Sequence, residues 1–364
     1  MINNCVVDGM AERTTVSVPT RSVTGSNFDT GCFSLWAEEE DANEDAGFNN
    51  IWKFGIFTAI IIAIIILIIV LIKLFLNQQQ LINKWEFPIE NLTFGKCLGE
   101  GAFGVAVMAT AIGLINKNVE TKVAVKMLKD DHRNYEDILD FKSEIDFMKK
   151  MGNHNNITTI LGSYEQDGSP CAIIEFASKG NILNFLNSMN PRASEKELLL
   201  YANQVAQGME YMHDKNLIHR DLAGRNILVT EKHNKIIMKI ADFGLARDIG
   251  KEGYYIEDRH ALNPRWIAPE SVNDNIFTFK SDVWTYGVLL WEIFTYGKAP
   301  DYIPLSHLSA GKRLDQPLDC SAVIYMIMLS CWDIIPEKRP TFQELVKRIE
   351  QILSSSREYL KLVW

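Results

Sequence analysis

One long hydrophobic run stands out in the chain. It extends from Phe54 to Ile72, nineteen residues without a charged side chain, and ten of them are isoleucine. As a helix rising 1.5 Å per residue, the run covers roughly 30 Å, the thickness of a bilayer's hydrocarbon core. A buried helix of a soluble domain is the alternative, but such helices rarely stay apolar on every face over this length. The pattern therefore predicts a single transmembrane helix, which we place at residues 54–76.

Behind this run the pattern changes to short alternating segments and then to longer helical ones. The β-type segments, separated by Gly and Asn turns, are Leu92–Leu98, Val105–Ile112 and Lys122–Leu128. The clearest helical patterns are Asp137–Lys150, Leu198–His213 and Val283–Phe294. This order predicts an α+β fold of two lobes, a β-rich N-lobe followed by an α-helical C-lobe.

The segment ahead of the apolar run is polar and acidic. Residues 1–53 carry nine Asp or Glu against three Lys or Arg, which is −6 of the chain's net charge of −9. Their lack of apolar periodicity predicts disorder or a small loop-rich segment. No apolar signal region occurs in the first twenty residues, so the apolar run would act as its own uncleaved insertion signal. A nucleic-acid-binding protein would instead present a basic face.

The six cysteines have no metal-like spacing, which excludes a zinc module or a dense disulfide scaffold. Cys5 and Cys32 lie in the acidic segment. If that segment is extracellular, they could pair within the chain or between chains, or they could remain free thiols.

The segment Gly99–Gly104 has the sequence Gly-Glu-Gly-Ala-Phe-Gly and lies between two β-type segments. Glycines at this spacing let backbone N–H groups approach phosphate oxygens without a side chain in the way. Dinucleotide folds and ordinary hairpin turns share the spacing, but a dinucleotide fold needs a helix directly afterwards, and Val105–Val107 is typical of a strand. The segment therefore favours a hairpin that covers phosphates.

Lys126 follows three apolar residues on a predicted strand. A lysine at a strand end is usually solvated, but an ammonium among apolar neighbours needs charged partners. ATP phosphates and a carboxylate would supply them. Glu144, eighteen residues later in a helical pattern, is the carboxylate that we expect to pair with Lys126.

The strongest signals are His219–Asn226, with the sequence His-Arg-Asp-Leu-Ala-Gly-Arg-Asn, and Asp242-Phe243-Gly244. Phosphoryl transfer needs a carboxylate that orients the acceptor hydroxyl and takes its proton, and oxygen ligands for Mg²⁺. The motifs match the protein-kinase pattern, in which Asp221 is the base and Asn226 and Asp242 hold the metal. A single Asp could be a turn or a cap, but five motifs in this order are not explained that way.

Ala268-Pro269-Glu270 closes the activation segment that begins at Asp242. We expect Glu270 to form an ion pair with Arg339, and Asp282 to anchor the backbone of the catalytic loop. Both roles are architectural.

From about Trp85 to Leu353 the chain resembles the receptor tyrosine kinases, in particular the fibroblast-growth-factor-receptor group. The catalytic loop differs from the receptor form by one residue, Gly224 in place of alanine, and Ala223 stands where serine/threonine kinases usually carry lysine. Three further segments are similar to that group: the stretch before the lobe, the hinge and the activation loop, which are Trp85–Pro88, Glu175–Asn181 and Asp242–Tyr255.

The resemblance implies a set of functional residues. ATP would be bound by Leu98, Gly99, Gly101, Gly104, Ala106, Lys126, Glu175 and Ala177, with Ile174 as gatekeeper. Catalysis would involve Asp221, Arg225, Lys126 and Glu144. The hydrophobic spine would consist of Met148, Ile160, His219 and Phe243. We also expect trans-phosphorylation of Tyr254 and Tyr255, whose phosphates would order the loop against Arg220 and its basic neighbours.

Three residues depart from the family pattern. Ala106 replaces a valine, which makes one wall over adenine smaller. Gly224 is expected to loosen the catalytic loop, because glycine is freer in the backbone. The usual Leu-Pro-Val-Lys-Trp becomes Leu262–Trp266 with the proline displaced to Pro264, which bears on the preference for tyrosine.

We therefore expect a receptor-type protein tyrosine kinase that uses ATP and Mg²⁺. Its parts would be an acidic extracellular segment (1–53), the span (54–76), a juxtamembrane segment (77–91), the kinase domain (92–353) and a short, mobile tail (354–364). Lysines on either side of the span give only a slight bias for an outside N-terminus. The need for ATP places the kinase domain in the cytoplasm, and the expected location is the cell membrane.

The expected partners are ATP, protein tyrosine substrates, the membrane and a second copy of the chain for trans-phosphorylation; no nucleic acid is expected. Three alternatives stay open. The chain could be a dual-specificity or serine/threonine kinase, a weakly active scaffold that signals by dimerising, or a receptor in which ligand binding by the short N-terminal segment is the main function.

Overall fold

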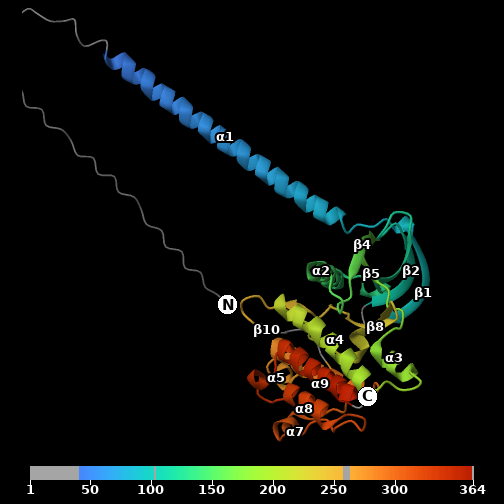
Figure 1. Ribbon diagram of the computed structural model, residues 1–364. Helices are drawn as coiled ribbons and strands as arrows, with labels where there is room; N and C mark the ends of the chain where they lie inside the picture. Colours follow the sequence, from blue (N-terminus) through green and yellow to red (C-terminus); the bar gives the residue numbers. More distant parts are fainter. Residues whose placement is uncertain (1–40, 102–103, 257–262, 363–364) are drawn as a thin grey trace, which may run out of the picture. The chain divides into compact units, whose positions relative to one another are not determined.

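The computed structural model describes residues 41–101, 104–256 and 263–362 (Figure 1). Cys5, Cys32 and most of the predicted acidic segment lie outside the described residues. The chain forms two units, residues 1–76 and 77–364. Helix α1 (Asp41–Asn83) contains Gly55–Leu76, a stretch of 22 residues with a mean hydropathy of 3.5 whose side chains are exposed. Among the described residues it is the helix long and apolar enough to cross a membrane, in agreement with the predicted span.

The N-lobe of the second unit is an antiparallel sheet with one helix (Figure 1). The strand order is β1-β2-β3-β5-β4, with β1 Leu92–Glu100, β2 Gly104–Ile112, β3 Glu120–Leu128, β4 Ile160–Gln166 and β5 Ser169–Glu175. Helix α2 (Tyr135–Met151) begins where Asn134 accepts the N–H of Asp137 at 2.9 Å. It buries one face at helical spacing, on which Glu144 is the charged residue.

The C-lobe is helical. Its helices are α3 Ile182–Ser188, α4 Glu195–Asp214, α5 Pro269–Asn273, α6 Phe279–Phe294, α7 Leu305–Ser309, α8 Ala322–Cys331 and α9 Phe342–Leu362. Ser194 and Thr278 cap α4 and α6 with capping boxes, which is why both helices start before the apolar periodicity predicted them to. Helix α6 is buried on nearly all sides and forms the centre of the lobe.

Short strand pairs and 3-10 turns flank the loops of the site. The pairs are β6 Leu217–Ile218 with β9 Arg247–Asp248, β7 Ile227–Lys232 with β8 Lys235–Ile240, and β10 Tyr255–Ile256 with β11 Ile276–Phe277. The 3-10 turns are η1 Ile89–Asn91, η2 Asp130–His132, η3 Gly224–Asn226 and η4 Pro336–Lys338.

Structured residues continue past both predicted ends of the kinase domain. Phe87 is already buried and its N–H donates to Ser163 of β4 at 3.0 Å, so packing against the lobe begins ahead of Leu92. Helix α9 continues through Ser354, where we placed the start of a tail, and ends at Leu362. No Gly or Pro follows Leu353 to stop the helix.

Candidate active site

The catalytic loop runs between β6 and β7, and a residue in the first turn of helix α6 holds its backbone in place. Asp282, which is 1% exposed, accepts the backbone N–H groups of His219 and Arg220, both at 2.9 Å. This confirms the anchoring role expected for Asp282. Because one buried carboxylate holds two consecutive amides, the residues just before Asp221 are fixed in position.

Asp221 is oriented by bonds from two residues of the same loop. Asn226 donates from its side-chain amide to the Asp221 carboxylate at 2.7 Å and to its backbone carbonyl at 2.8 Å. The Arg225 guanidinium also contacts the carboxylate and lies over the Trp266 ring, 5.1 Å from its centroid. The Asp221 side chain stays 23% exposed, so it is oriented by its neighbours and still accessible to a substrate hydroxyl.

Three sequence-predicted residues from different elements meet beside the loop. The Lys126 ammonium on β3 lies 2.6 Å from the Glu144 carboxylate on α2 and 3.0 Å from the Asp242 carboxylate after β8. Burial by itself lowers the pKa of Lys126, but the two carboxylates outweigh it, so the pKa is raised overall. The charge of Lys126 in turn holds the pKa of Asp242 below its usual value. The lysine therefore keeps its positive charge at neutral pH.

The residues expected to hold Mg²⁺ fit that ion. Asn226 donates both of its hydrogen bonds through the amide nitrogen, which leaves its carbonyl oxygen as a ligand. The Asp242 side chain is 54% exposed, so its carboxylate can reach a metal while one oxygen bonds Lys126. An amide oxygen and a carboxylate oxygen are hard donors of the kind that Mg²⁺ prefers, together with phosphate oxygens.

The glycine-rich segment Gly99–Gly104 connects β1 with β2 beside the site. Ala102 and Phe103 lie outside the described residues. The Gly101 N–H donates to the Gly104 carbonyl at 2.8 Å, which closes the turn. A Cβ at Gly104 would lie 2.8 Å from the Met127 carbonyl, so only glycine permits this approach of β2 to β3. In the sheet, Ala106 of β2 pairs with Lys126 of β3 and with Gly99 of β1. Ala106, one of the residues predicted to bind ATP, therefore lies next to the lysine.

In the hinge, Glu175 already uses its backbone N–H inside the lobe. The Glu175 N–H donates to the Thr159 carbonyl at 3.0 Å, so the backbone group that Glu175 can offer to adenine is its carbonyl. Its side chain accepts the Thr159 N–H at 2.7 Å and pairs with the Lys239 ammonium at 2.7 Å. Lys239 was not predicted to have a role; its signal in the sequence is a charged residue between the apolar residues Met238 and Ile240 of β8.

The four predicted spine residues, Met148, Ile160, His219 and Phe243, are all buried. The His219 and Phe243 ring centroids are 5.6 Å apart, and His219 bonds to the Ala241 carbonyl through a ring nitrogen at 3.2 Å. The spine thus ties the Asp242 segment to the catalytic loop.

The activation segment carries the two predicted phosphorylation sites. Tyr254 is 46% exposed. Tyr255 is half-buried, and two guanidinium groups lie near its ring, with Arg220 4.7 Å and Arg247 5.5 Å from the ring centroid. Residues 257–262, including Leu262 of the altered motif, lie outside the described residues, and Pro264 is exposed.

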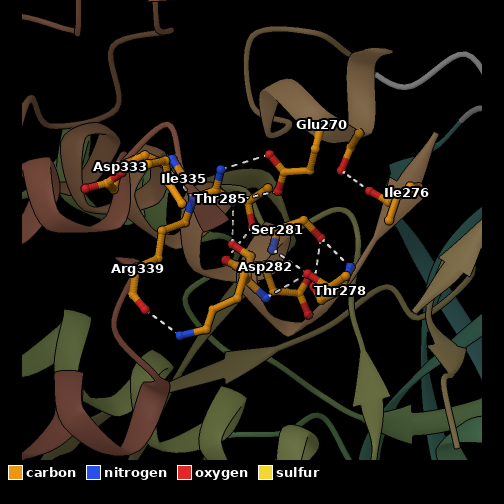
Figure 2. Close-up of polar contacts among 11 residues, drawn as sticks. Glu270, Ile276, Thr278, Ser281, Asp282, Thr285, Asp333, Ile335 and Arg339 are labelled. Carbon is orange, nitrogen blue, oxygen red and sulfur yellow. Dashed lines mark hydrogen bonds and ion pairs between the residues drawn. The ribbon is translucent and has the colours of Figure 1, made fainter. Parts of the chain in front are cut away.

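The Glu270 and Arg339 ion pair is confirmed (Figure 2). The two terminal guanidinium nitrogens of Arg339 lie 2.6 Å and 2.8 Å from the two carboxylate oxygens of Glu270. Arg339 also donates to the backbone carbonyls of Lys280 and Asp333, both at 2.9 Å. Through these bonds the fully buried Arg339 connects α5, α6 and η4 at the end of the activation segment.

Glu292 was not predicted to have a role, and Gly224 has a different role from the predicted one. Glu292 is 2% exposed and accepts the Gly224 N–H at 2.9 Å; its signal was being the only charged residue in the apolar pattern Val283–Phe294. Gly224 is buried, and its φ is not positive, so the loop does not use the freedom of glycine. A Cβ there would lie 2.3 Å from Cδ2 of Leu183 on α3. Gly224 provides room for Leu183 instead of loosening the loop.

Comparisons with known proteins agree with this geometry. The family model described as protein tyrosine and serine/threonine kinase matches residues 92–349. Fibroblast growth factor receptor 1 of Xenopus laevis is 46% identical over 304 residues, which cover 77% of this chain and 37% of the receptor. The protein of the same name from Pleurodeles waltl gives the same identity and coverage. The chain therefore spans little more than a third of the length of these relatives.

Proposed function

This chain belongs to the protein tyrosine and serine/threonine kinase family, and we propose that it is a membrane-anchored, receptor-type kinase that transfers the γ-phosphate of ATP to protein tyrosine. The observation that carries this proposal is the catalytic loop. Ala223 stands where a lysine is usual in serine/threonine kinases, and Arg225, two residues later, bonds Asp221 and covers Trp266. The identity to fibroblast growth factor receptors supports the same acceptor.

In the proposed reaction each residue has a separate task. Lys126, kept charged by Glu144, would bind the phosphates of ATP, and the glycine-rich hairpin of β1 and β2 would cover them. Mg²⁺ held by Asn226 and Asp242 would neutralise phosphate charge. Asp221 would accept the proton of the tyrosine hydroxyl and hold the oxygen in line with the phosphate.

The acceptor is tested with the full chain in lipid nanodiscs, Mg²⁺-ATP and two peptides that differ only in Tyr or Ser. We expect phosphotyrosine as the product, and no transfer from the Asp221→Asn variant, which keeps the shape of the side chain but removes the base. Comparable phosphoserine would establish a dual-specificity kinase. Transfer no greater than that of Asp221→Asn would favour the dimerising scaffold.

We further propose regulation by trans-phosphorylation of Tyr254 and Tyr255 in a second copy of the chain. Phosphate adds about −1.5 to −2 charge at neutral pH. The guanidinium groups of Arg220 and Arg247 already lie near the Tyr255 ring, so a phosphate on this residue would meet positive charge. Because Tyr254 is exposed, it is accessible to another kinase molecule.

The test compares wild type with Tyr254→Phe, Tyr255→Phe and the double variant in an autophosphorylation time course. Wild type should accelerate as phosphate accumulates, and the double variant should keep a constant slow rate. If the double variant accelerates like wild type, the two tyrosines have no regulatory role.

A further inference from the structure

The turn between β2 and β3 exposes three aliphatic side chains. Ile112, Ile115 and Val119 are 43%, 61% and 49% exposed. The backbone of the turn is fixed, because the Gly113 N–H donates to the Val119 carbonyl at 3.0 Å and the Val119 N–H donates to the Asn116 carbonyl at 3.1 Å. Single exposed aliphatic residues are ordinary, but here three lie within eight residues of one hairpin, and exposed apolar surface often marks a contact site.

The chain enters the kinase lobe beside this turn. The Trp85 carbonyl accepts the Ser163 N–H of β4 at 2.6 Å. A Cβ built on the adjacent Gly162 would lie 3.3 Å from the Trp85 carbonyl oxygen and 3.5 Å from Cδ1 of Leu114, which belongs to the turn. The base of the turn and the entry point of the chain therefore meet on the same strand.

The covalent connection to the apolar run is short. Nine residue steps separate Leu76, the last residue of that run, from Trp85. A fully extended chain of nine residues spans at most about 30 Å, and a helical one about 13 Å. If Gly55–Leu76 crosses a bilayer, this length keeps the Trp85 entry point, and the turn next to it, close to the lipid surface.

We propose that the β2–β3 turn (Ile112–Val119) docks on the membrane, with Ile115 and Val119 among the upper acyl chains and Lys117 at the phosphates. This inference rests on the proposed membrane anchoring. Aliphatic side chains beside an exposed lysine match the apolar and anionic layers of a bilayer surface. Glu120, which pairs with Ile112 in the sheet, begins β3 behind the tip. A short tether gives a millimolar effective concentration, so weak intrinsic affinity is sufficient.

The test uses the full chain in nanodiscs with a genetically encoded, environment-sensitive fluorophore at Asn116, and compares ordinary with brominated phospholipids. Bromine quenches a probe that enters the acyl region, and we expect the emission of this probe to fall by about half or more. A probe at Leu318, which is 100% exposed in the C-lobe, should be unaffected. Equal, negligible quenching at both positions would overturn the proposal.

Two further variants separate the causes. Ile115→Asn with Val119→Asn should abolish quenching at Asn116, whereas Val323→Asn with Met326→Asn, equally exposed on α8 (57% and 62%), should not. Unchanged peptide phosphorylation would show that the variants are folded. A probe at Ile64 reports on the anchor. If Ile64 is quenched and Asn116 is not, only the docking fails; if Ile64 is not quenched, the anchoring and the docking fail together.

Discussion

At the scale of single residues, the most informative pair is Gly224 and Leu183. Leu183 on α3 fills the space above Gly224 in the catalytic loop, with Cγ 2.9 Å and Cδ2 2.3 Å from where a Cβ would be. The alanine of the receptor form does not fit here unless Leu183 moves. The small residue in the loop and the large residue on the helix are thus complementary.

We therefore predict that Gly224→Ala destabilises the folded protein by about 1–3 kcal/mol, as overpacking does, and lowers kcat by displacing Asp221. Leu183→Ala in the same chain should restore both the melting temperature and kcat, since it makes room for the methyl group. Leu183→Ala alone is the control. If Gly224→Ala has wild-type kcat, Leu183 moves aside freely and the pair does not position the loop.

At the scale of elements, helix α6 holds the catalytic loop from two places. Asp282 in its first turn binds the amides before Asp221, and Glu292 near its end binds the amide of Gly224 after it. A buried helix with two carboxylates aimed at one loop fixes the direction of the Asp221 side chain. The pKa of Glu292 is raised by burial, although its bond from Gly224 works in the opposite direction.

This raised pKa has a testable consequence for stability. The folded state binds the Glu292 proton more tightly than the unfolded state, so its contribution to stability is full below the unfolded value near 4.5 and is lost as the pH rises through the folded pKa. Glu292→Gln keeps an acceptor for the Gly224 N–H but cannot titrate. Its melting temperature should therefore improve relative to wild type as the pH rises above the unfolded value near 4.5 and through the folded pKa. A difference that is constant with pH would contradict this assignment.

At the scale of the whole molecule, the proposed function depends on the apolar part of α1. Gly55–Leu76 is exposed on all sides among the described residues, which a soluble domain would have to avoid. A bilayer would cover this surface, and it would restrict encounters between kinase domains to two dimensions. Trans-phosphorylation would then depend on surface density in the membrane.

We predict that the full chain stays in the membrane pellet after extraction with alkaline carbonate. Ile64→Lys with Ile65→Lys should release it to the supernatant, since each lysine at the centre of a span costs about 2.5–3.5 kcal/mol on the insertion scale. The inactive variant Lys126→Met should remain in the pellet, which separates anchoring from activity. Release of the wild-type chain would contradict the proposed anchor.

Much of the fold could be predicted from the sequence, because its signals are local. The alternating apolar and polar positions predicted β1, β2 and β3 to within a few residues, and the helical spacing did the same for α2 and α4. Errors occurred at the ends, where Ser194 and Thr278 extend helices beyond their apolar periodicity, and where nothing stops α9 at Leu353. A cap or a missing stop signal is a weaker pattern than a repeating apolar face.

Residue type and spacing along the chain were enough to predict the apolar run, the order of the elements and the pairing of Lys126 with Glu144. Only the tertiary structure decided which distant residues support them. Glu292 reaches Gly224 across 68 positions, and Lys239 reaches Glu175 across the hinge. Such pairs depend on how helices and strands pack in space, and buried partners are chosen by proximity and desolvation, which no spacing along the chain records.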